Sequence, residues 1–392
     1  MVEPQHEHHV MSVAFYAPLK SPDHPTPSGD RRMARALIDA LGRTGQRIDL
    51  ACRLRSYDRT GDAVRQRRLQ MLGLRCAGRL SRRYRGGHDR PQAWLTYHGY
   101  HKAPDWLGPE VTSDLRIPYL LAEASFAPKQ AFGPWALGHR ATEQALRQAD
   151  VVLGLTRLDL ECLAPLIAPP AELRYLPPFL DPAPYLAARE ARDRHRAELA
   201  ARWRLDLGRP WLLTVAMMRA DVKRESYRLL ADALGRILGG AWQLLVVGDG
   251  PARAEIEAAF APLGESRVAF AGAIGAGLEA CYAAADLYVW PAVREAYGVA
   301  MLEAQAAGLP VVAGREGGVE EVVQHDLTGI LTPPRDPRAL AHAMSQLLDD
   351  PERRHAMAES AWRFVAGHRS LAGAAQALAE ALQAARTIRA TR

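Results

Sequence analysis

A strand, a turn and a helix follow one another in Ala285-Asp-Leu-Tyr-Val-Trp-Pro-Ala-Val-Arg-Glu295-Ala-Tyr-Gly298-Val-Ala-Met-Leu-Glu303. Glu295 and Glu303 stand eight residues apart, a spacing that brings two side chains near one face of a helix. The helix, which we expect to end at Ala307-Gly308, presents free N–H groups and a positive dipole end at its start. This one element therefore offers carboxylates that suit hydroxyl groups and amides that suit a phosphate.

The sequence on the C-terminal side of this helix narrows the interpretation, because a Glu-x7-Glu pair alone is also common on solvated helices. It is followed by the buried-strand pattern Leu309-Pro-Val-Val-Ala313, by Gly317-Gly-Val-Glu-Glu321 and by Leu327-Thr-Gly-Ile-Leu-Thr-Pro-Pro-Arg-Asp336. Together these segments resemble the C-terminal half of family 4 glycosyltransferases, which are retaining enzymes of the GT-B fold. The resemblance is strongest over residues 210–360.

Strand and helix patterns alternate along the whole chain of 392 residues. The length is that of two ordinary domains, and the alternation predicts parallel sheets covered by helices on both faces. The resemblance implies an α/β fold of the GT-B type, in which two Rossmann-like, doubly wound domains face a central cleft. We therefore expect an N-terminal acceptor domain over residues 1–180, a nucleotide-sugar donor domain over 181–365 and a C-terminal helix over 366–392 that crosses back to the first domain.

The resemblance assigns donor-binding roles in the second domain. Lys223 and Arg219 follow the strand that ends at Ala216, where two cations would hold a diphosphate whose negative charge grows as it leaves. Glu295 would contact hydroxyls of the transferred sugar, and Glu303 those of the ribose. Further donor contacts would come from backbone groups of Ala273, Ile274, Tyr297, Gly298 and Val299. The alternative is that the two cations are ordinary surface residues.

In the first domain the chain both follows the family pattern and departs from it. Gly29 belongs to a small-residue loop whose amides would approach the donor phosphate or the acceptor. The family carries a histidine after a strand of the type found in Ile117-Pro-Tyr-Leu-Leu121, and here Glu123 or Ser125 stands near that position. We therefore include Glu123 among the catalytic candidates.

Two histidines and several absences bear on the chemistry. His98 and His101 follow the preceding strand, where they would either line the acceptor side of the cleft or be buried, satisfied core residues. The sequence has no Asp-x-Asp motif, and its core segments show neither a Ser-His-Asp arrangement nor a metal-ligand cluster. We therefore expect transfer without a metal ion or cofactor, with lysine and arginine stabilising the leaving diphosphate.

Residues 59–90 form a basic segment with ten arginines and only two acids. Apolar residues are interleaved with the arginines, namely Leu69, Met71, Leu72, Leu74 and Leu80. The pattern is typical of an amphipathic helix on an anionic membrane surface, and equally of a solvated helix whose arginine stems lie along the protein. Binding to nucleic acid is disfavoured, because the segment nearly lacks aromatic residues for base stacking.

The rest of the sequence predicts a cytoplasmic protein, peripheral at most to the inner face of the membrane. No apolar run reaches the length of a membrane-spanning helix, and the N-terminus does not resemble a signal peptide. The histidine cluster at residues 6–9 is typical of a polar tail rather than a metal site. Four scattered cysteines without a Cys-x-x-Cys pair indicate reduced thiols and no structural zinc.

The resemblance to family 4 glycosyltransferases implies that the protein is a retaining glycosyltransferase of the hexosyltransferase type. It would move a sugar from a nucleotide diphosphate to a glycan or lipid-linked acceptor, in cell-envelope or exopolysaccharide assembly. Two alternatives stay open: a catalytically silent sugar-nucleotide-binding protein, and a sugar-phosphate synthase or epimerase on the same fold. The side chains do not specify the sugar or the nucleotide, because base recognition in the family uses mainly backbone groups.

Overall fold

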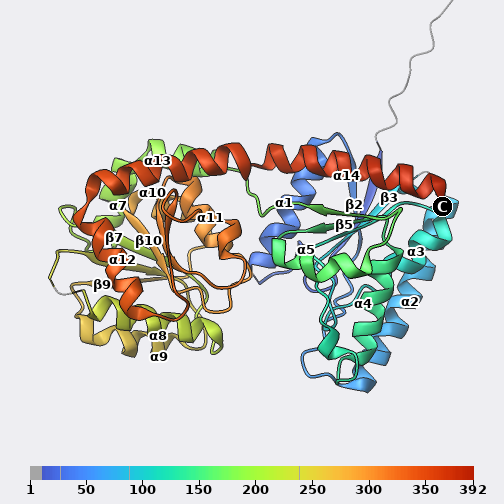
Figure 1. Cartoon of the computed structure of the whole chain (residues 1–392), viewed down its shortest axis with the longest axis horizontal. Helices are drawn as coiled ribbons and strands as arrows, with labels where there is room; N and C mark the ends of the chain where they lie inside the picture. Colours follow the sequence, from blue (N-terminus) through green and yellow to red (C-terminus); the bar gives the residue numbers. More distant parts are fainter. Residues whose placement is uncertain (1–10, 27, 88, 238) are drawn as a thin grey trace, which may run out of the picture. The chain divides into compact units, whose positions relative to one another are not determined.

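A computed structural model divides the chain into two compact units (Figure 1). It describes residues 11–26, 28–87, 89–237 and 239–392. Unit 1 comprises the described residues up to Pro177 together with Leu371–Arg392, and unit 2 comprises Pro178–Ser370. The histidine cluster at residues 6–9 lies outside the described residues.

Unit 1 is built on a six-stranded parallel sheet with the strand order β2-β1-β3-β4-β5-β6. Its strands are β1 (Ser12–Tyr16), β2 (Arg47–Cys52), β3 (Ala93–Tyr97), β4 (Tyr119–Ala122), β5 (Val151–Gly154) and β6 (Glu172–Tyr175). Its helices are α1 (Gly29–Arg43), α2 (Ala63–Gly86), α3 (Gly108–Leu115), η1 (Pro128–Gln130), α4 (Ala136–Gln148), α5 (Arg157–Leu163), η2 (Ala164–Leu166) and α14 (Leu371–Thr391). From β1 the chain first adds β2 on one side, and it then adds β3 to β6 on the other side. Because such connections are right-handed, α1 packs with α14 on one face of the sheet, and α2, α3 and α4 pack on the other (Figure 1).

Unit 2 repeats this architecture with a six-stranded parallel sheet in the order β12-β11-β10-β7-β8-β9. Its strands are β7 (Trp211–Val215), β8 (Gln243–Val247), β9 (Val268–Gly272), β10 (Leu287–Trp290), β11 (Val311–Gly314) and β12 (Gly329–Thr332). Its helices are α6 (Ala183–Glu190), α7 (Arg192–Trp203), α8 (Val222–Gly235), α9 (Arg253–Phe260), η3 (Ala261–Leu263), α10 (Leu278–Ala284), α11 (Val299–Ala306), η4 (Val319–Glu321), α12 (Pro337–Asp349) and α13 (Pro351–His368). Helices α8, α9 and α12 pack together, as do α6, α7, α10, α11 and α13.

The prediction of two doubly wound α/β sheets is confirmed. The strand predicted within Ala285–Pro291 is β10, and the one predicted within Leu309–Ala313 is β11. Near the C-terminus, where the sequence predicts a helix over 366–392, α13 ends at His368 and α14 begins at Leu371, with a break at Arg369-Ser370 between them. The basic segment is largely helical, as expected, because α2 covers most of it.

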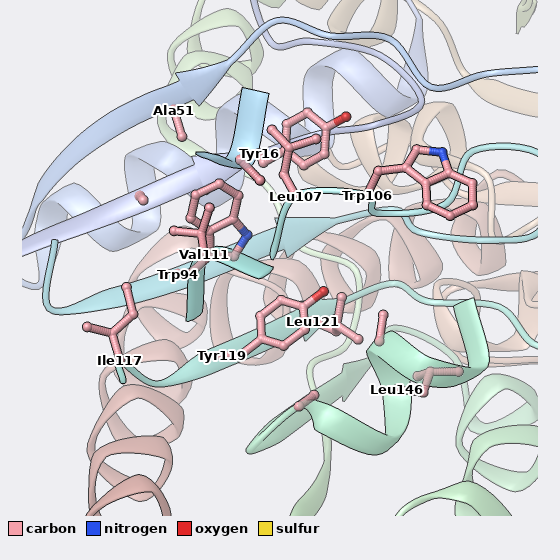
Figure 2. Packing of buried hydrophobic residues seen from close by; sticks show 14 of the residues in the cluster. Tyr16, Ala51, Trp94, Trp106, Leu107, Val111, Ile117, Tyr119, Leu121 and Leu146 are labelled. Carbon is pink, nitrogen blue, oxygen red and sulfur yellow. The ribbon is translucent and has the colours of Figure 1, made fainter. Parts of the chain in front are cut away.

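Buried aromatic residues organise the core of unit 1 on the side of α2 to α4 (Figure 2). One buried acid, Asp105, is hydrogen-bonded to this core. Trp94 and Tyr119 extend from β3 and β4 into this core, and both are fully buried. The Tyr119 hydroxyl donates to Asp105 Oδ2 at 2.8 Å, and two backbone N–H groups at the start of α3 donate to Asp105 Oδ1. Because both carboxylate oxygens are hydrogen-bonded, the acid is satisfied in the core and fixes the segment that follows β3.

Candidate functional site

Lys223 and Glu295 form an ion pair at the carboxyl edge of the unit 2 sheet. Lys223 lies in the first turn of α8, after β7, and Glu295 lies in the loop after β10; Lys223 Nζ is 2.5 Å from Glu295 Oε2. Trp290 Nε1 donates to the same oxygen at 3.0 Å, and the ammonium lies 5.2 Å from the centre of the Trp290 ring. The two charged side chains are only 16% and 17% exposed. This edge of a doubly wound sheet is where such folds bind ligands.

Glycines on both sides hold the backbone of the Glu295 loop. Gly298, which precedes α11, has a φ of +80°, and a Cβ there would lie 3.3 Å from Glu295 Cγ. Gly317 has a φ of +63°, and a Cβ there would lie 2.0 Å from the Glu295 carbonyl oxygen. The Gly318 N–H donates to the Ala296 carbonyl at 2.7 Å. The Gly317-Gly318 motif thus braces the loop from the neighbouring strand end, since a larger residue would be strained and would clash.

Glu303 is held by a different element from Glu295. It is 3% exposed on α11, and its Oε2 accepts a hydrogen bond from the Tyr282 hydroxyl at 2.8 Å. Tyr282 lies on α10, where its ring packs 6.1 Å from that of Tyr185. The expectation that Glu295 and Glu303 share one helical face is wrong, because α11 begins only after the left-handed turn at Gly298.

The other predicted donor-side residues follow strands of the same sheet and differ in their exposure. Arg219 follows β7, is about half exposed and pairs with Asp221, with a distance of 3.1 Å between Nε and Oδ2. Tyr297 is buried in the turn before α11. Ala273 and Ile274 directly follow β9, and Ala273 is exposed. Their contacts to a donor stay predictions.

The carboxyl edge of the unit 1 sheet holds an imidazole among carboxylates. His98 follows β3 and Glu123 follows β4, and both have left-handed backbone angles, with φ of 59° and 55°. His98 Nδ1 lies 3.1 Å from Oδ1 of Asp30, in the first turn of α1, and 3.7 Å from Oε1 of Glu123. Left-handed backbone at a non-glycine residue costs on the order of 1 kcal/mol, and such strain is concentrated at functional sites.

Burial and charge act in opposite senses on this cluster. Burial lowers the pKa of His98, but the carboxylates of Glu123 and Asp30 raise it, and the resulting pKa is about 8. Burial raises the pKa of Glu123 more than His98 lowers it. For Asp30, burial raises the pKa, but the contact with His98 lowers it below its usual value. At neutral pH, His98 is therefore an imidazolium paired with the Asp30 carboxylate.

Gly29 and His101 lie in other surroundings. Gly29 is the first residue of α1, directly after Ser28, whose side chain caps the helix. The ring of His101 packs 5.9 Å from that of Trp135. Burial, with neighbouring basic groups, lowers the pKa of His101 to about 4, so this histidine is neutral at physiological pH. The two histidines that the sequence predicts together thus differ in charge, and only His98 faces the carboxylates.

Three residues of these clusters were not among the predicted site residues, namely Asp30, Tyr282 and Trp290. An acid in the first turn after the Ser28-Gly29 loop was the available signal for Asp30, and a tryptophan at the end of a predicted strand was the signal for Trp290. Tyr282 gave no local signal. Within the described ranges, no group of three or more His, Cys, Asp or Glu side chains is placed to hold a metal ion.

Residues 209–350 match the family model described as Glycosyl transferases group 1, and this stretch lies inside unit 2. Over 201 residues the chain is 35% identical to the alpha-D-kanosaminyltransferase of Streptomyces kanamyceticus, covering 50% of this chain and 52% of that protein. Over 229 residues it is 34% identical to the GDP-mannose-dependent alpha-(1-6)-phosphatidylinositol monomannoside mannosyltransferase of Mycobacterium tuberculosis, covering 55% and 57%. The chain thus aligns with about half the length of these relatives.

Solved structures match over nearly the full length. The sucrose-phosphate synthase from Thermosynechococcus elongatus is similar with a TM-score of 0.69 and 21% identity, covering 95% of this chain and 98% of that one. HepE of Anabaena in complex with UDP is similar with a TM-score of 0.71 and 16% identity, covering 95% and 100%. At these identities the likeness shows the fold, and the expected GT-B class, with its two Rossmann-like units, is confirmed.

Proposed function

We propose that this protein is a retaining glycosyltransferase that moves a sugar from a nucleotide diphosphate to an acceptor hydroxyl. The observation that carries the proposal is the partly buried Lys223–Glu295 ion pair, within the stretch that matches the glycosyltransferase family model. A leaving nucleotide diphosphate gains negative charge in the transition state, and a preorganised ammonium group stabilises that charge. Glu295 holds the ammonium in place before the donor binds.

Each residue at the unit 2 edge has a separate role in this proposal. Lys223, assisted by Arg219, binds the diphosphate. Glu295 accepts hydrogen bonds from the transferred sugar, and Glu303 accepts them from the ribose. Tyr282 fixes the orientation of the Glu303 carboxylate, since its hydroxyl already donates to one oxygen. Backbone groups of the turn before α11 and of the loop after β9 complete the donor contacts.

Transfer proceeds on one face of the sugar without a cofactor. The bond from the anomeric carbon to the leaving phosphate oxygen breaks, and the acceptor oxygen bonds to that carbon from the same side. The acceptor proton passes to the leaving phosphate oxygen, so no protein base is needed. In this scheme His98 and Glu123 position hydroxyl groups, His98 as a hydrogen-bond donor and Glu123 as an acceptor. His98 has the role of the histidine that the family carries near residue 123.

The proposed acceptor is a glycan or lipid-linked sugar at the cytoplasmic face of a membrane, in cell-envelope or exopolysaccharide assembly. Helix α2 supports this, because Val64 and Met71 on it are 77% and 53% exposed. Among the described residues, no acid pairs with five arginines of the helix, Arg67, Arg68, Arg75, Arg79 and Arg82. Exposed apolar and unpaired basic side chains suit an anionic lipid surface. None of the helices in the described ranges is long and apolar enough to cross a membrane.

Vesicle binding tests the lipid surface. Replacing Arg68, Arg75 and Arg82 with glutamine should weaken binding to anionic vesicles on the order of a hundredfold, since each basic group contributes about 1 kcal/mol. The matched control replaces Arg194, Arg228 and Arg236, three arginines on the surface of unit 2, and should change binding little. Equal effects of the two triple variants would remove this surface from the proposal.

Incubation of the purified protein with nucleotide sugars tests the activity itself. A thermal-shift screen with UDP, GDP and ADP first identifies the nucleotide, because a ligand of the native state raises the unfolding temperature. Transfer to candidate acceptors is then followed by mass spectrometry, and NMR of the product gives its anomeric configuration. A silent binding protein would show the shift without turnover, and a synthase would accept only a sugar phosphate. Inversion of the configuration, or no effect of any nucleotide, would contradict the proposal.

A further inference from the structure

Unit 1 holds two cysteines on neighbouring elements, outside the site described above. Cys52 is the last residue of β2, and Cys76 lies in the middle of α2. Both are partly buried and pack against the same hydrophobic core cluster of the unit. The Leu54 N–H donates to Cys52 Sγ at 3.4 Å, which fixes the position of that sulfur. Neither cysteine has a role in the proposed transfer.

A contact at the far end of α2 sets the register of the helix against β2. The Tyr84 hydroxyl donates to Asp49 Oδ2 at 2.8 Å, and Arg83 Nη2 lies 3.2 Å from the same oxygen. Cys52 is three strand residues beyond Asp49, or about 10 Å. Cys76 is eight helix residues before Tyr84, or about 12 Å. In a strand–helix–strand unit the helix runs antiparallel to the strand. The two distances from the Asp49–Tyr84 contact, one along β2 and one along α2, are similar, so Cys52 and Cys76 lie opposite each other.

The orientation of Cys76 on α2 agrees with this placement. Cys76 stands seven residues before Arg83, or about two turns of helix, so the two side chains lie on the same flank. Arg83 reaches β2 from that flank. Burial raises the pKa of the Cys52 thiol, and the neighbouring Cys76 thiol raises it further.

We propose that Cys52 and Cys76 are a redox-sensitive pair that forms a disulfide between β2 and α2. The thiolate of one cysteine attacks a small-molecule disulfide such as oxidised glutathione, which gives a mixed disulfide and one glutathione thiol. The second cysteine then displaces the other glutathione thiol. The protein loses two electrons and two protons, and one disulfide of the oxidant becomes two thiols. The bond closes residues 52–76 into a ring and ties the helix with the unpaired arginines to the sheet.

The other two cysteines serve as internal references. Cys162 lies on α5 and is exposed, so it takes up a mixed disulfide but has no neighbouring thiol. Cys281 is buried on α10, and burial raises its pKa to about 12, so it stays a thiol. A Cys162→Ser variant therefore removes the competing reaction and leaves the pair intact.

The test treats the full chain carrying Cys162→Ser with oxidised glutathione at about pH 8.5, because a raised thiol pKa slows the reaction at neutral pH. We expect the mass to fall by two hydrogen atoms and peptide mapping to find a cross-link from Cys52 to Cys76. The unfolding temperature of unit 1 should rise on the order of 5–10 °C and return after treatment with dithiothreitol. In a further variant with Cys76→Ser, Cys52 should instead keep a glutathionyl group, without the rise.

Two outcomes would overturn the proposal. One is a stable mixed disulfide on Cys52 and on Cys76 without a cross-link between them. The other is recovery of both thiols unmodified under conditions in which Cys162 of the native sequence is fully glutathionylated.

Discussion

The two units have the same ion-pair arrangement at the amino edge of the sheet and different charged groups at the carboxyl edge. Asp150 precedes β5 and accepts from the Tyr119 N–H at 2.8 Å; Asp286 precedes β10 and accepts from the Trp211 N–H at 2.7 Å. Two arginines hold each carboxylate, Arg389 and Arg392 for the first and Arg192 and Arg196 for the second. This shared arrangement satisfies a backbone donor at the start of a central strand, so it belongs to the architecture.

At the carboxyl edges the charges differ. The unit 2 edge presents two cations, each paired with one carboxylate: Lys223 with Glu295, and Arg219, in the segment before α8, with Asp221. The unit 1 edge presents one imidazolium, that of His98, against the carboxyls of Asp30 and Glu123. A diphosphate is attracted by the first arrangement and disfavoured by the second. The comparison teaches that one architecture supports two separate chemistries, which its loops determine.

The largest effect is expected from Lys223→Ala, which should lower the transfer rate about a thousandfold because the leaving diphosphate loses its main cation. Lys223→Arg should recover part of the rate, since it restores the charge with a different geometry. Initial rates at saturating donor measure the effect, and an unchanged unfolding temperature shows that the fold is intact. Turnover of Lys223→Ala near that of the native protein would contradict the proposal that the unit 2 edge stabilises the diphosphate.

The shared amino edge predicts equal losses of stability. Asp150→Ala and Asp286→Ala should each lower the free energy of unfolding of the unit that carries the substitution by about 3 kcal/mol, because each leaves two arginines and a strand N–H without their partner. Urea unfolding, followed by hydrogen exchange within each unit, measures the two losses. Asp232→Ala, which breaks an exposed pair with Arg236 at the C-terminal end of α8, should cost less than about 0.5 kcal/mol. A large loss of stability from only one of Asp150→Ala and Asp286→Ala would show that the two amino edges are not equivalent.

His98 should make transfer depend on pH. Its pKa is raised to about 8, so its charge is present below that pH and is lost as the pH rises through about 8. Transfer should fall over the same range, and His98→Gln should be roughly tenfold slower and lack this alkaline decline. By linkage, the pair with Asp30 stabilises unit 1 fully below the unfolded pKa of about 6.5, and this contribution disappears above about pH 8.

His101→Gln is the matched control for this profile. Because the pKa of His101 is lowered to about 4, it carries no charge in this range, and the variant should keep the alkaline decline. The same decline in the native protein and in His98→Gln would show that another group is responsible.

The smallest effect is expected from Tyr282→Phe. Loss of one hydrogen bond to Glu303 should weaken donor binding about fivefold, or about 1 kcal/mol. Competition with pyrophosphate distinguishes the ribose contact from the diphosphate contact, because pyrophosphate has no ribose. Pyrophosphate should bind the variant as well as it binds the native protein. Equal weakening for both ligands would place Tyr282 in the support of the diphosphate site instead.

Most of the fold could be predicted because the central strands are continuous apolar runs bounded by turns. Two of the four edge strands, β6 and β12, gave no such signal. In β6, Glu172-Leu-Arg-Tyr175 alternates charged with apolar residues and is half-buried throughout. Strand β12 begins with Gly329, where a Cβ would lie 2.1 Å from the Val311 carbonyl oxygen. The glycine is required because β11 lies so close to it, and the sequence alone does not show that the two strands are neighbours.

The candidate site was predictable where each of its residues follows closely after an apolar strand of the sheet. Glu295 and Gly298 follow one strand, and Lys223 follows another strand of the same sheet. The unit 1 cluster was predicted only in part, because Asp30 and His98 are far apart in the chain and meet through a left-handed turn at a non-glycine residue. The difference in charge between His98 and His101 depends on burial and on carboxylates from other elements. No pattern along the chain indicates these.

The most direct test of the central claim is a calorimetric titration of the native protein, Lys223→Ala and His98→Gln with the nucleoside diphosphate that the thermal-shift screen selects. If the carboxyl edge of unit 2 binds the diphosphate, Lys223→Ala should weaken its affinity at least about tenfold, and His98→Gln should leave it unchanged. Unchanged affinity in Lys223→Ala together with a loss in His98→Gln would contradict the account.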